Sequence, residues 1–172
     1  NRLFGFDGND TLDAGYGADR IEGGLGADQY VFSGNNVTGT GTPVTETVVG
    51  FVSGTDKIVL VGLALGADGN FASNDARFKA GAFNSGQDAD DRIIYNTGTG
   101  QIWYDWDGNG GGAAELIATL QNRPALAASD IVVANSTGGS TPGGGGAGGS
   151  GSATAGNDSI VGGSGNDSID GL

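Results

Sequence analysis

Histidine, cysteine and methionine are absent from the 172 residues of this chain. Without histidine or cysteine there can be no Ser-His or Cys-His nucleophile pair, no thiolate chemistry and no ordinary zinc site. The lack of cysteine also excludes a disulfide scaffold, so any extra stabilisation would have to come from packing or from hard metal ions. We therefore expect that this chain is not an enzyme by itself.

Basic residues and long apolar runs are also scarce. Lysine and arginine together number 7 against 20 acidic residues, which gives a formal net charge of −13. Such a charge argues against nucleic acid or an anionic membrane surface as a partner. No apolar run approaches the roughly 18 residues that a membrane-spanning helix needs. The sequence therefore predicts no nucleic-acid partner and no membrane span.

Glycine, by contrast, is abundant, with 37 residues, roughly three times its usual share. Much of it falls in nonapeptides that carry Gly at position 4, Asp at position 6 and a large apolar residue at position 8. The copies that share one phase are residues 5–13, 14–22, 23–31, 153–161 and 162–170. Residues 1–4 fit as the tail of a further copy, with Asn1 in the position of the Asp.

The residue types of the nonapeptide suit a metal-binding turn. Glycines allow a positive φ, so the chain can turn tightly and direct several carbonyl groups inward. The carboxylate at position 6 closes the turn, and the apolar residue at position 8 points from a short strand into the body. Two stacked turns would enclose a cage of carboxylate and carbonyl oxygens, which suits Ca²⁺ better than Mg²⁺. Ordinary turn formation is the alternative, but five copies in phase make it a poor explanation.

The sequence divides into four segments: residues 1–32, a first repeat block; 33–135, a β domain; 136–152, a Gly/Ser-rich linker; and 153–172, an incomplete second block. Alternation of apolar and polar residues predicts strands in the second segment. These strands are expected at Gln29–Ser33, Thr45–Phe51, Lys57–Val61, Arg92–Asn96, Gln101–Trp106, Ala114–Leu120 and Asp130–Val133.

The nonapeptides resemble the calcium-binding repeats of the RTX family of secreted bacterial proteins. Residues 30–133 also resemble the β domain of serralysin-type C-terminal modules, in the stretches 48–58, 91–95, 103–108 and 128–133. The resemblance implies an all-β fold: a parallel β-roll, a β-sandwich-like domain, the linker and a second short β-roll. In such a roll, turns on the same side lie 18 residues apart.

By that rule Asp10 pairs with Asp28, and Asn1 pairs with Asp19. The resemblance implies a set of metal ligands in the two blocks, made of acidic side chains and turn carbonyls. This set comprises Asn1, Gly5, Asp7, Gly8, Asp10, Gly15, Gly17, Asp19, Gly24, Gly26, Asp28, Asp158 and Asp167. The site with Asn1 should be weaker, because it lacks one negative charge. Asp158 and Asp167 have no same-side partner in their own block, so a neighbouring block or a second copy of the chain is expected to complete their cages.

A separate candidate lies between two predicted strands. Asp105, Asp107 and Asn109 place oxygen ligands at positions 1, 3 and 5 of a loop that resembles the first half of an EF-hand. The acid expected at position 12 is replaced by Leu116, and strands rather than helices flank the loop. The sequence leaves two interpretations open, a polar hairpin loop and an isolated calcium site.

The resemblance also implies a function. RTX relatives are exported by type I secretion and fold on Ca²⁺ outside the cell, so we expect an extracellular or cell-surface structural module. The linker and the second block favour a multi-block adhesin, surface-layer or filament protein. The alternative is the folding module of an extracellular protease, lipase or polysaccharide-modifying enzyme with its catalytic domain elsewhere.

Overall fold

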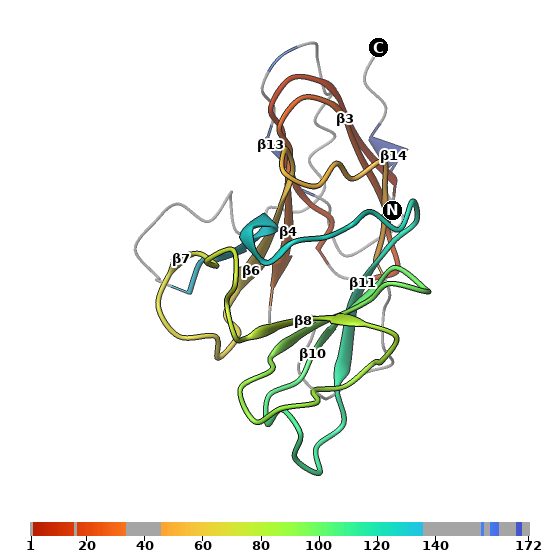
Figure 1. The fold of residues 1–172 in the computed structure, drawn as a ribbon. Helices are drawn as coiled ribbons and strands as arrows, with labels where there is room; N and C mark the ends of the chain where they lie inside the picture. The colour runs from red at the N-terminus through yellow and green to blue at the C-terminus, as the bar shows by residue number, and fades with distance from the viewer. Residues whose placement is uncertain are drawn as a thin grey trace.

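The computed structural model describes residues 2–15, 17–33 and 46–135, Gly156, and the backbone of Ser159–Val161 and Ser168–Ile169. These residues form two facing β-sheets, with the described core between them (Figure 1). One 3₁₀-helix, Ala128–Asp130, is the only helical segment within these ranges, and no helix there is long and apolar enough to cross a membrane. The prediction of an all-β fold is confirmed.

Both sheets mix parallel and antiparallel strands, and parallel pairs predominate. The first has the strand order β14-β1-β3-β5-β11-β10-β9-β8 and the second β13-β2-β4-β6-β12-β7. The first contains β14 (Ser168–Ile169), β1 (Arg2–Asp7), β3 (Arg20–Leu25), β5 (Glu46–Val49), β11 (Glu115–Leu120), β10 (Gln101–Tyr104), β9 (Ile93–Asn96) and β8 (Phe78–Gly81). The second contains β13 (Ser159–Val161), β2 (Thr11–Asp13), β4 (Gln29–Ser33), β6 (Lys57–Val61), β12 (Ile131–Val133) and β7 (Gly69–Asn70).

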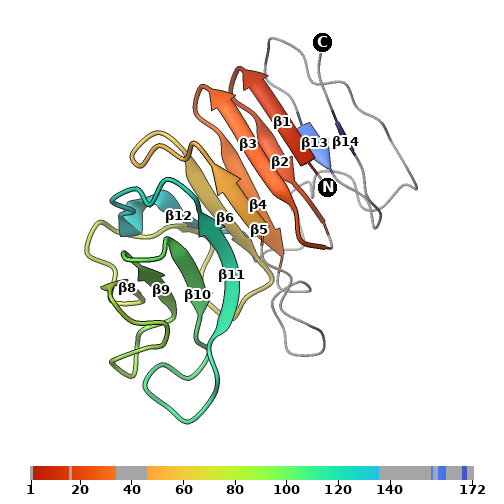
Figure 2. The same ribbon diagram turned by 90° about the vertical axis from the view of Figure 1, so that its right-hand side faces the viewer.

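The N-terminal repeats form a roll in which successive strands alternate between the two sheets (Figure 2). Each repeat supplies one strand, and its apolar residue at position 8 points into the space between the sheets. Leu3, Leu12, Ile21 and Tyr30 are accordingly at most 1% exposed. Burial of such a side chain stabilises the fold by about 1.5–3 kcal/mol. The expected role of position 8 is confirmed.

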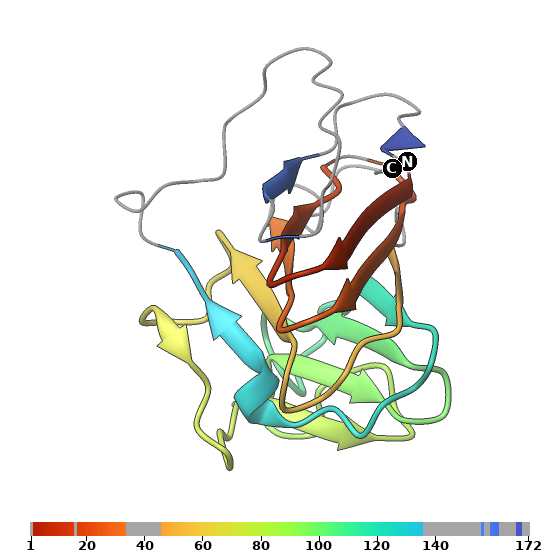
Figure 3. The same cartoon turned by 90° about the horizontal axis from the view of Figure 1, so that it is seen from above.

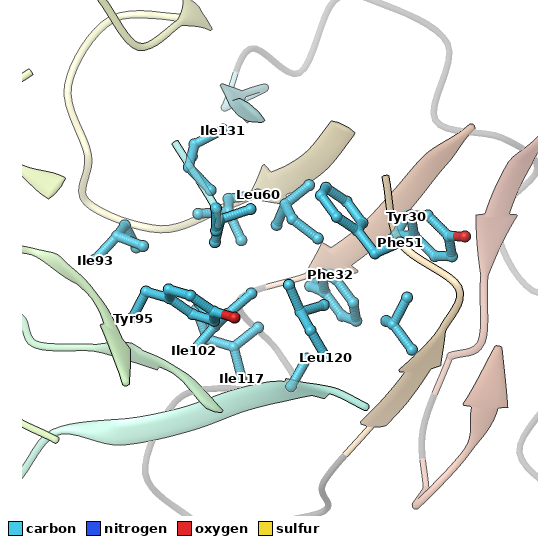
Figure 4. Close-up of a cluster of buried hydrophobic side chains, with 14 of the residues drawn as sticks. Tyr30, Phe32, Phe51, Leu60, Ile93, Tyr95, Ile102, Ile117, Leu120 and Ile131 are labelled. Atoms are coloured by element: carbon cyan, nitrogen blue, oxygen red, sulfur yellow. The ribbon is translucent and has the colours of Figure 1, made fainter. Parts of the chain in front are cut away.

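The two sheets continue from the roll into residues 46–135 without a break. Strand β5 pairs in parallel with both β3 and β11, and β6 pairs in parallel with both β4 and β12. The sequence-based boundary between residues 32 and 33 thus falls inside β4. The apolar core is also continuous, and Figure 4 shows Tyr30 and Phe51 from the roll end in one cluster with Tyr95 and Ile102.

Most predicted strands lie where the alternation of residues placed them. Strands β4 and β6 have the predicted bounds, and β5, β9, β10, β11 and β12 differ by one or two residues. Strands β7 and β8 are not predicted by the sequence. Gly69–Asn70 and Phe78–Gly81 carry no alternation of apolar and polar residues, and they become strands through pairing with β12 and β9.

The C-terminal repeats differ from the prediction. Strand β13 pairs in parallel with β2, and β14 pairs in parallel with β1, so both extend the sheets of the first roll. Figure 3 shows these short strands beside the N-terminal repeat strands. The prediction of a second, separate roll is therefore wrong for the described strands of this block. The free edge of the first roll offers them unpaired backbone groups, which two short strands of their own could not satisfy. The division of the chain into four independently folding segments stays a prediction.

Candidate metal centre

The acidic residues at position 6 form a column along the second sheet. Thr11 lies opposite Gln29, and Gln29 lies opposite Lys57, so the acids one residue earlier are in register. The backbone N–H of Asp10 donates to Oδ1 of Asp28 at 3.0 Å, and that of Asp28 donates to Oδ1 of Asp56 at 3.1 Å. All three acids are at most 2% exposed. The predicted pairing of Asp10 with Asp28 is thus seen in the backbone register.

A second column runs along the first sheet. The register of Ile21 with Val48 places Asp19 beside Glu46, and the backbone N–H of Asp19 donates to Oε2 of Glu46 at 3.0 Å. Both acids are 3% exposed. Burial, reinforced by the charge of Asp19, raises the pKa of Glu46 to about 8. This column is therefore a pair of crowded acids away from solvent.

Two members of these columns, Asp56 and Glu46, were missed by the sequence analysis. Residues 51–59 are a degenerate nonapeptide, with Gly54 at position 4, Asp56 at position 6 and Ile58 at position 8. Glu46 likewise precedes the buried Val48 by two residues, as position 6 precedes position 8. A strict nonapeptide pattern does not match these two copies, because the copy with Asp56 lacks glycine at position 2 and the other has Glu46 in place of Asp. The spacing of an acid two residues before a buried apolar residue is nevertheless present in both.

The stacked turns contain glycines that no larger residue could replace. A Cβ on Gly5 would overlap both the carboxylate of Asp10 and the carbonyl oxygen of Gly23. A Cβ on Gly24, where φ is 107°, would overlap the backbone carbonyl of Phe6, and one on Gly26 would overlap that of Gly8. Carbonyl oxygens of one turn thus lie against the glycines of the next turn, and beside Gly5 the carbonyl of Gly23 and the carboxylate of Asp10 both approach.

The remaining sequence-predicted ligands lie in these turns or outside the described residues. The side chain of Asp7 is exposed at the end of β1, and the N–H of Gly8 donates to the carbonyl of Leu25 at 2.8 Å. Gly15 and Gly17 have positive φ, and a Cβ on Gly17 would be 3.7 Å from either carboxylate oxygen of Asp19. Asn1, Asp158 and Asp167 lie outside the described residues.

The carboxylate of Asp28 fits a bound cation. Its Oδ1 accepts the hydrogen bond from Asp10, whereas its Oδ2 is buried and has no hydrogen-bond partner. Burial, with the charges of Asp56 and Asp10 beside it, raises the pKa of Asp28. A buried carboxylate oxygen without a donor costs free energy that a hard cation would recover. The donors at hand are all oxygens, as Ca²⁺ prefers.

The third turn of this column is closed by protein groups. Asp130 is fully buried and accepts hydrogen bonds from the hydroxyl of Ser53 at 2.6 Å, the N–H of Gly54 at 2.9 Å and the N–H of Ala127 at 3.0 Å. The ammonium group of Lys57 lies 3.7 Å from the same carboxylate. Asp130 therefore supplies, from the 3₁₀-helix, the negative charge and hydrogen bonds that hold this turn.

The separate candidate loop joins β10 to β11. Asp105 is buried, Asp107 is half-buried and Asn109 is exposed. Trp106 is 61% exposed at this loop, whereas Tyr104 packs in the core. Within the described ranges no three acidic side chains gather into one metal-binding group, so any cation site there would also draw on backbone or amide oxygens.

Stacked glycine-rich turns with buried acids, set between two largely parallel sheets, define a repeat protein with oxygen-lined turns. Residues 1–37 and 143–172 match the sequence model of the RTX calcium-binding nonapeptide repeat, in four copies. The chain therefore carries RTX calcium-binding repeats at both ends, and such repeats bind Ca²⁺ as a structural ligand. The resemblance of residues 30–133 to serralysin-type modules stays a prediction. Comparisons with curated proteins and with solved structures found no match.

Proposed function

We propose that this chain is a calcium-dependent structural module of a secreted or cell-surface protein and carries no catalytic activity of its own. The observation that supports the proposal most strongly is the column of buried acids. Asp10, Asp28 and Asp56 lie in register, and one oxygen of Asp28 is buried without a donor. Such a column is self-repelling, so its folding is expected to depend on a bound cation.

The chain's own residues would hold the ion in the stacked turns. Asp10 and Asp28 supply carboxylates, and the turn glycines leave room for carbonyls such as that of Gly23 to approach. The backbone N–H of Asp10 orients the carboxylate of Asp28, and the backbone N–H of Asp28 orients that of Asp56. Bound Ca²⁺ would supply positive charge and a coordination shell that holds two turns together. Folding is then coupled to calcium, which is scarce in the cytoplasm of cells and abundant outside them.

The setting that fits this coupling best is a protein exported unfolded and folded outside the cell, as type I secretion of RTX proteins implies. The pairing of β13 with β2 and of β14 with β1 supports a protein assembled from successive repeat blocks, since the roll edge accepts further repeat strands in register. We therefore favour a multi-block surface protein, with self-association or contact with a neighbouring RTX block as its mode of assembly.

Hydrogen exchange of the full chain, with Ca²⁺ and with a chelator, tests the proposal. Chelation should remove protection from the roll strands Thr11–Asp13 and Arg20–Leu25 more than from the hairpin strands Ile93–Asn96 and Gln101–Tyr104. The Asp28→Asn variant should bind Ca²⁺ about tenfold more weakly or worse, because it removes a charged ligand.

Glu22→Gln is the matched control. Glu22 lies on β3 and pairs with Arg20 at 3.4 Å, with its side chain 40% exposed. Loss of such a surface charge should leave calcium binding almost unchanged. Equal exchange in the roll with and without chelator, or equal losses of affinity in the two variants, would overturn the proposal.

A further inference from the structure

The loop between β10 and β11 holds a buried carboxylate that the roll does not explain. Asp105 follows directly after β10 and is 0% exposed. Its Oδ2 accepts a hydrogen bond from the backbone N–H of Gly86 at 2.9 Å, but its Oδ1 is buried and has no hydrogen-bond partner. Leaving a buried acceptor unsatisfied is unfavourable, and more so for a charged group.

A second carboxylate of the same loop has the same arrangement. Oδ2 of Asp107 accepts a hydrogen bond from the backbone N–H of Gly112 at 2.9 Å, and its Oδ1 is buried without a partner. In both acids, therefore, a loop N–H holds one oxygen in place and the other is turned away from water. Two buried carboxylate oxygens without a donor in one loop are costly unless a positive charge compensates them.

No positive side chain neutralises these acids among the described residues. The ion pairs there join Arg20 to Glu22, Lys57 to Asp130, Arg77 to Asp75 and Lys79 to Asp88. Arg92, which is near in the chain, directs its guanidinium to the carbonyls of Ala89 and Asp91. Two acids with buried oxygens and no basic partner favour a metal cation as the compensating charge.

The surrounding backbone holds the loop in a fixed form. The N–H of Asn109 donates to the carbonyl of Asp88 at 3.1 Å, and Gly108 has a φ of 66°. A Cβ on Gly86 would lie 2.6 Å from the carbonyl carbon of Gly108, so the two loops pack backbone against backbone. The carboxylates are therefore set by a rigid support before any ion arrives, which lowers the entropic cost of binding.

We propose that Asp105 and Asp107 form a calcium site that is separate from the roll. The exposed Asn109 is placed two residues further along the loop, where its amide oxygen can add a third ligand. Carboxylate, amide and backbone oxygens suit Ca²⁺, because Mg²⁺ demands a stricter octahedron and keeps its water. Figure 2 shows this loop at the opposite end of the molecule from β1 and β3.

The two tryptophans of the chain make the site separately measurable. Trp103 lies on β10 and Trp106 lies in the loop, so both flank Asp105, and the chain has no other tryptophan. Terbium(III), which replaces Ca²⁺ in oxygen sites, would emit on tryptophan excitation only when it is bound near this loop. We expect saturable emission from the full chain that added Ca²⁺ displaces more effectively than Mg²⁺ does.

Variants decide whether these acids are the ligands. Asp107→Asn should weaken the tryptophan-sensitised terbium binding about tenfold or more, with the far-ultraviolet circular dichroism unchanged. Asp105→Asn should do the same, and Asp107→Asn keeps the test valid if that variant fails to fold. Asp90→Asn, which changes an exposed acid of the adjacent loop, is the matched control and should leave binding unaltered.

Loss of calcium binding at this loop can be distinguished from loss of calcium binding in the roll. Asp28→Asn should reduce calcium binding in the roll and leave the tryptophan-sensitised emission unchanged, whereas Asp107→Asn should do the reverse. Calorimetric titration with Ca²⁺ should show one site fewer in Asp107→Asn than in the unaltered chain. Absence of sensitised emission from the unaltered chain, or equal emission from Asp107→Asn, would overturn the assignment of this loop.

Discussion

Glycine at position 4 of a repeat serves two different purposes in this chain. Gly26 and Gly54 both have a positive φ, 141° and 84° respectively, so each permits a turn that other residues adopt with strain. Only Gly26 is also required for space, because a Cβ there would overlap the carbonyl of Gly8 in the turn above, whereas a Cβ on Gly54 would meet nothing within 4 Å. Close stacking of turns therefore constrains Gly26 more tightly than the turn itself does.

The pair gives a matched prediction. Gly54→Ala should lower the free energy of unfolding by about 1–2 kcal/mol, the cost of the backbone strain alone. Gly26→Ala should lower it by roughly 3 kcal/mol or more, because the overlapping carbonyl must move as well. Denaturant unfolding of both variants in saturating Ca²⁺ measures the difference. Equal losses would show that turns 5–10 and 23–28 are not packed as closely as the structure has them.

At the scale of secondary-structure elements, the turns of the roll are held by two different means. The turn that ends at Asp28 has a buried carboxylate oxygen without a donor, whereas the turn that ends at Asp56 has both oxygens bonded, to the N–H groups of Asp28 and Val52. Asp130 accepts two further hydrogen bonds from the turn that ends at Asp56, from the hydroxyl of Ser53 and the N–H of Gly54. We infer that dependence on calcium decreases along the roll toward β6.

Substitution of Asp130 tests this difference. Asp130→Ala leaves the N–H groups of Gly54 and Ala127 without their acceptor, and should lower the free energy of unfolding by roughly 2–4 kcal/mol. Since the interaction needs no metal, the loss should be similar with Ca²⁺ and with a chelator. Thermal or denaturant unfolding in the two conditions measures it, and a loss confined to the calcium-loaded chain would contradict the inference.

The buried acids also predict how the metal-free chain responds to pH. Burial raises the pKa of Glu46 to about 8, and it raises the pKa of Asp28 and Asp56 as well. A group with a raised pKa in the folded state favours folding fully below its unfolded pKa, and this contribution is lost as the pH rises through the folded value. In chelator, stability should therefore increase on acidification from about pH 9 toward about pH 5.

Thermal unfolding in chelator across this range measures the effect. Glu46→Gln removes the acid whose pKa is raised to about 8, and it should flatten the dependence of stability on pH between about pH 4.5 and about pH 8. With Ca²⁺ bound the trend should weaken or reverse, because protons then compete with the ion for the same carboxylates. A metal-free chain that becomes more stable as the pH rises would contradict the burial of these acids.

At the scale of the whole molecule, two strands of the C-terminal repeats lie beside the N-terminal strands β1 and β2. Strands β13 and β14 occupy the edges of the two sheets beside β2 and β1, although more than a hundred residues separate them in the sequence. Along the N-terminal repeats, each strand of the sequence lies further along the roll toward β5 and β6. In the C-terminal repeats β13 lies beside β2 and the later β14 lies beside β1, so these two strands follow one another in the opposite direction along the roll. These two C-terminal strands instead cover the outer edges of β1 and β2.

Removal of residues 136–172 tests this closure. Without β13 and β14, the backbone groups along the outer edges of β1 and β2 are exposed, and exposed edges invite association with another chain. We expect faster hydrogen exchange in Arg2–Asp7 and Thr11–Asp13, with Lys57–Val61 unchanged, and calcium-dependent association detected by light scattering. Unaltered exchange in β1 and β2, with no association, would show that the C-terminal repeats do not cover this edge in solution.

The sequence by itself determined the parts of this protein that depend on local chemistry. Period-nine spacing of glycine, acid and apolar residue predicted the turns, the strands and the burial of Leu12 and Ile21, because these residues recur in phase and neighbouring repeats therefore stack in the same way. The 18-residue pairing of Asp10 with Asp28 followed from the resemblance of that pattern to RTX repeats. Alternation likewise predicted most strands of residues 46–135 to within two residues.

Tertiary structure alone decided the features that depend on contacts between distant segments. The roles of Glu46 and Asp56 come from strand register, and that of Asp130 comes from a hydrogen-bonding distance across 76 residues of chain to Gly54. The docking of the C-terminal strands on the first roll likewise depends on which sheet edge is open. A repeat pattern specifies how neighbouring turns of one block stack, but it does not say which sheet edge a distant block joins, since backbone pairing is the same for every copy.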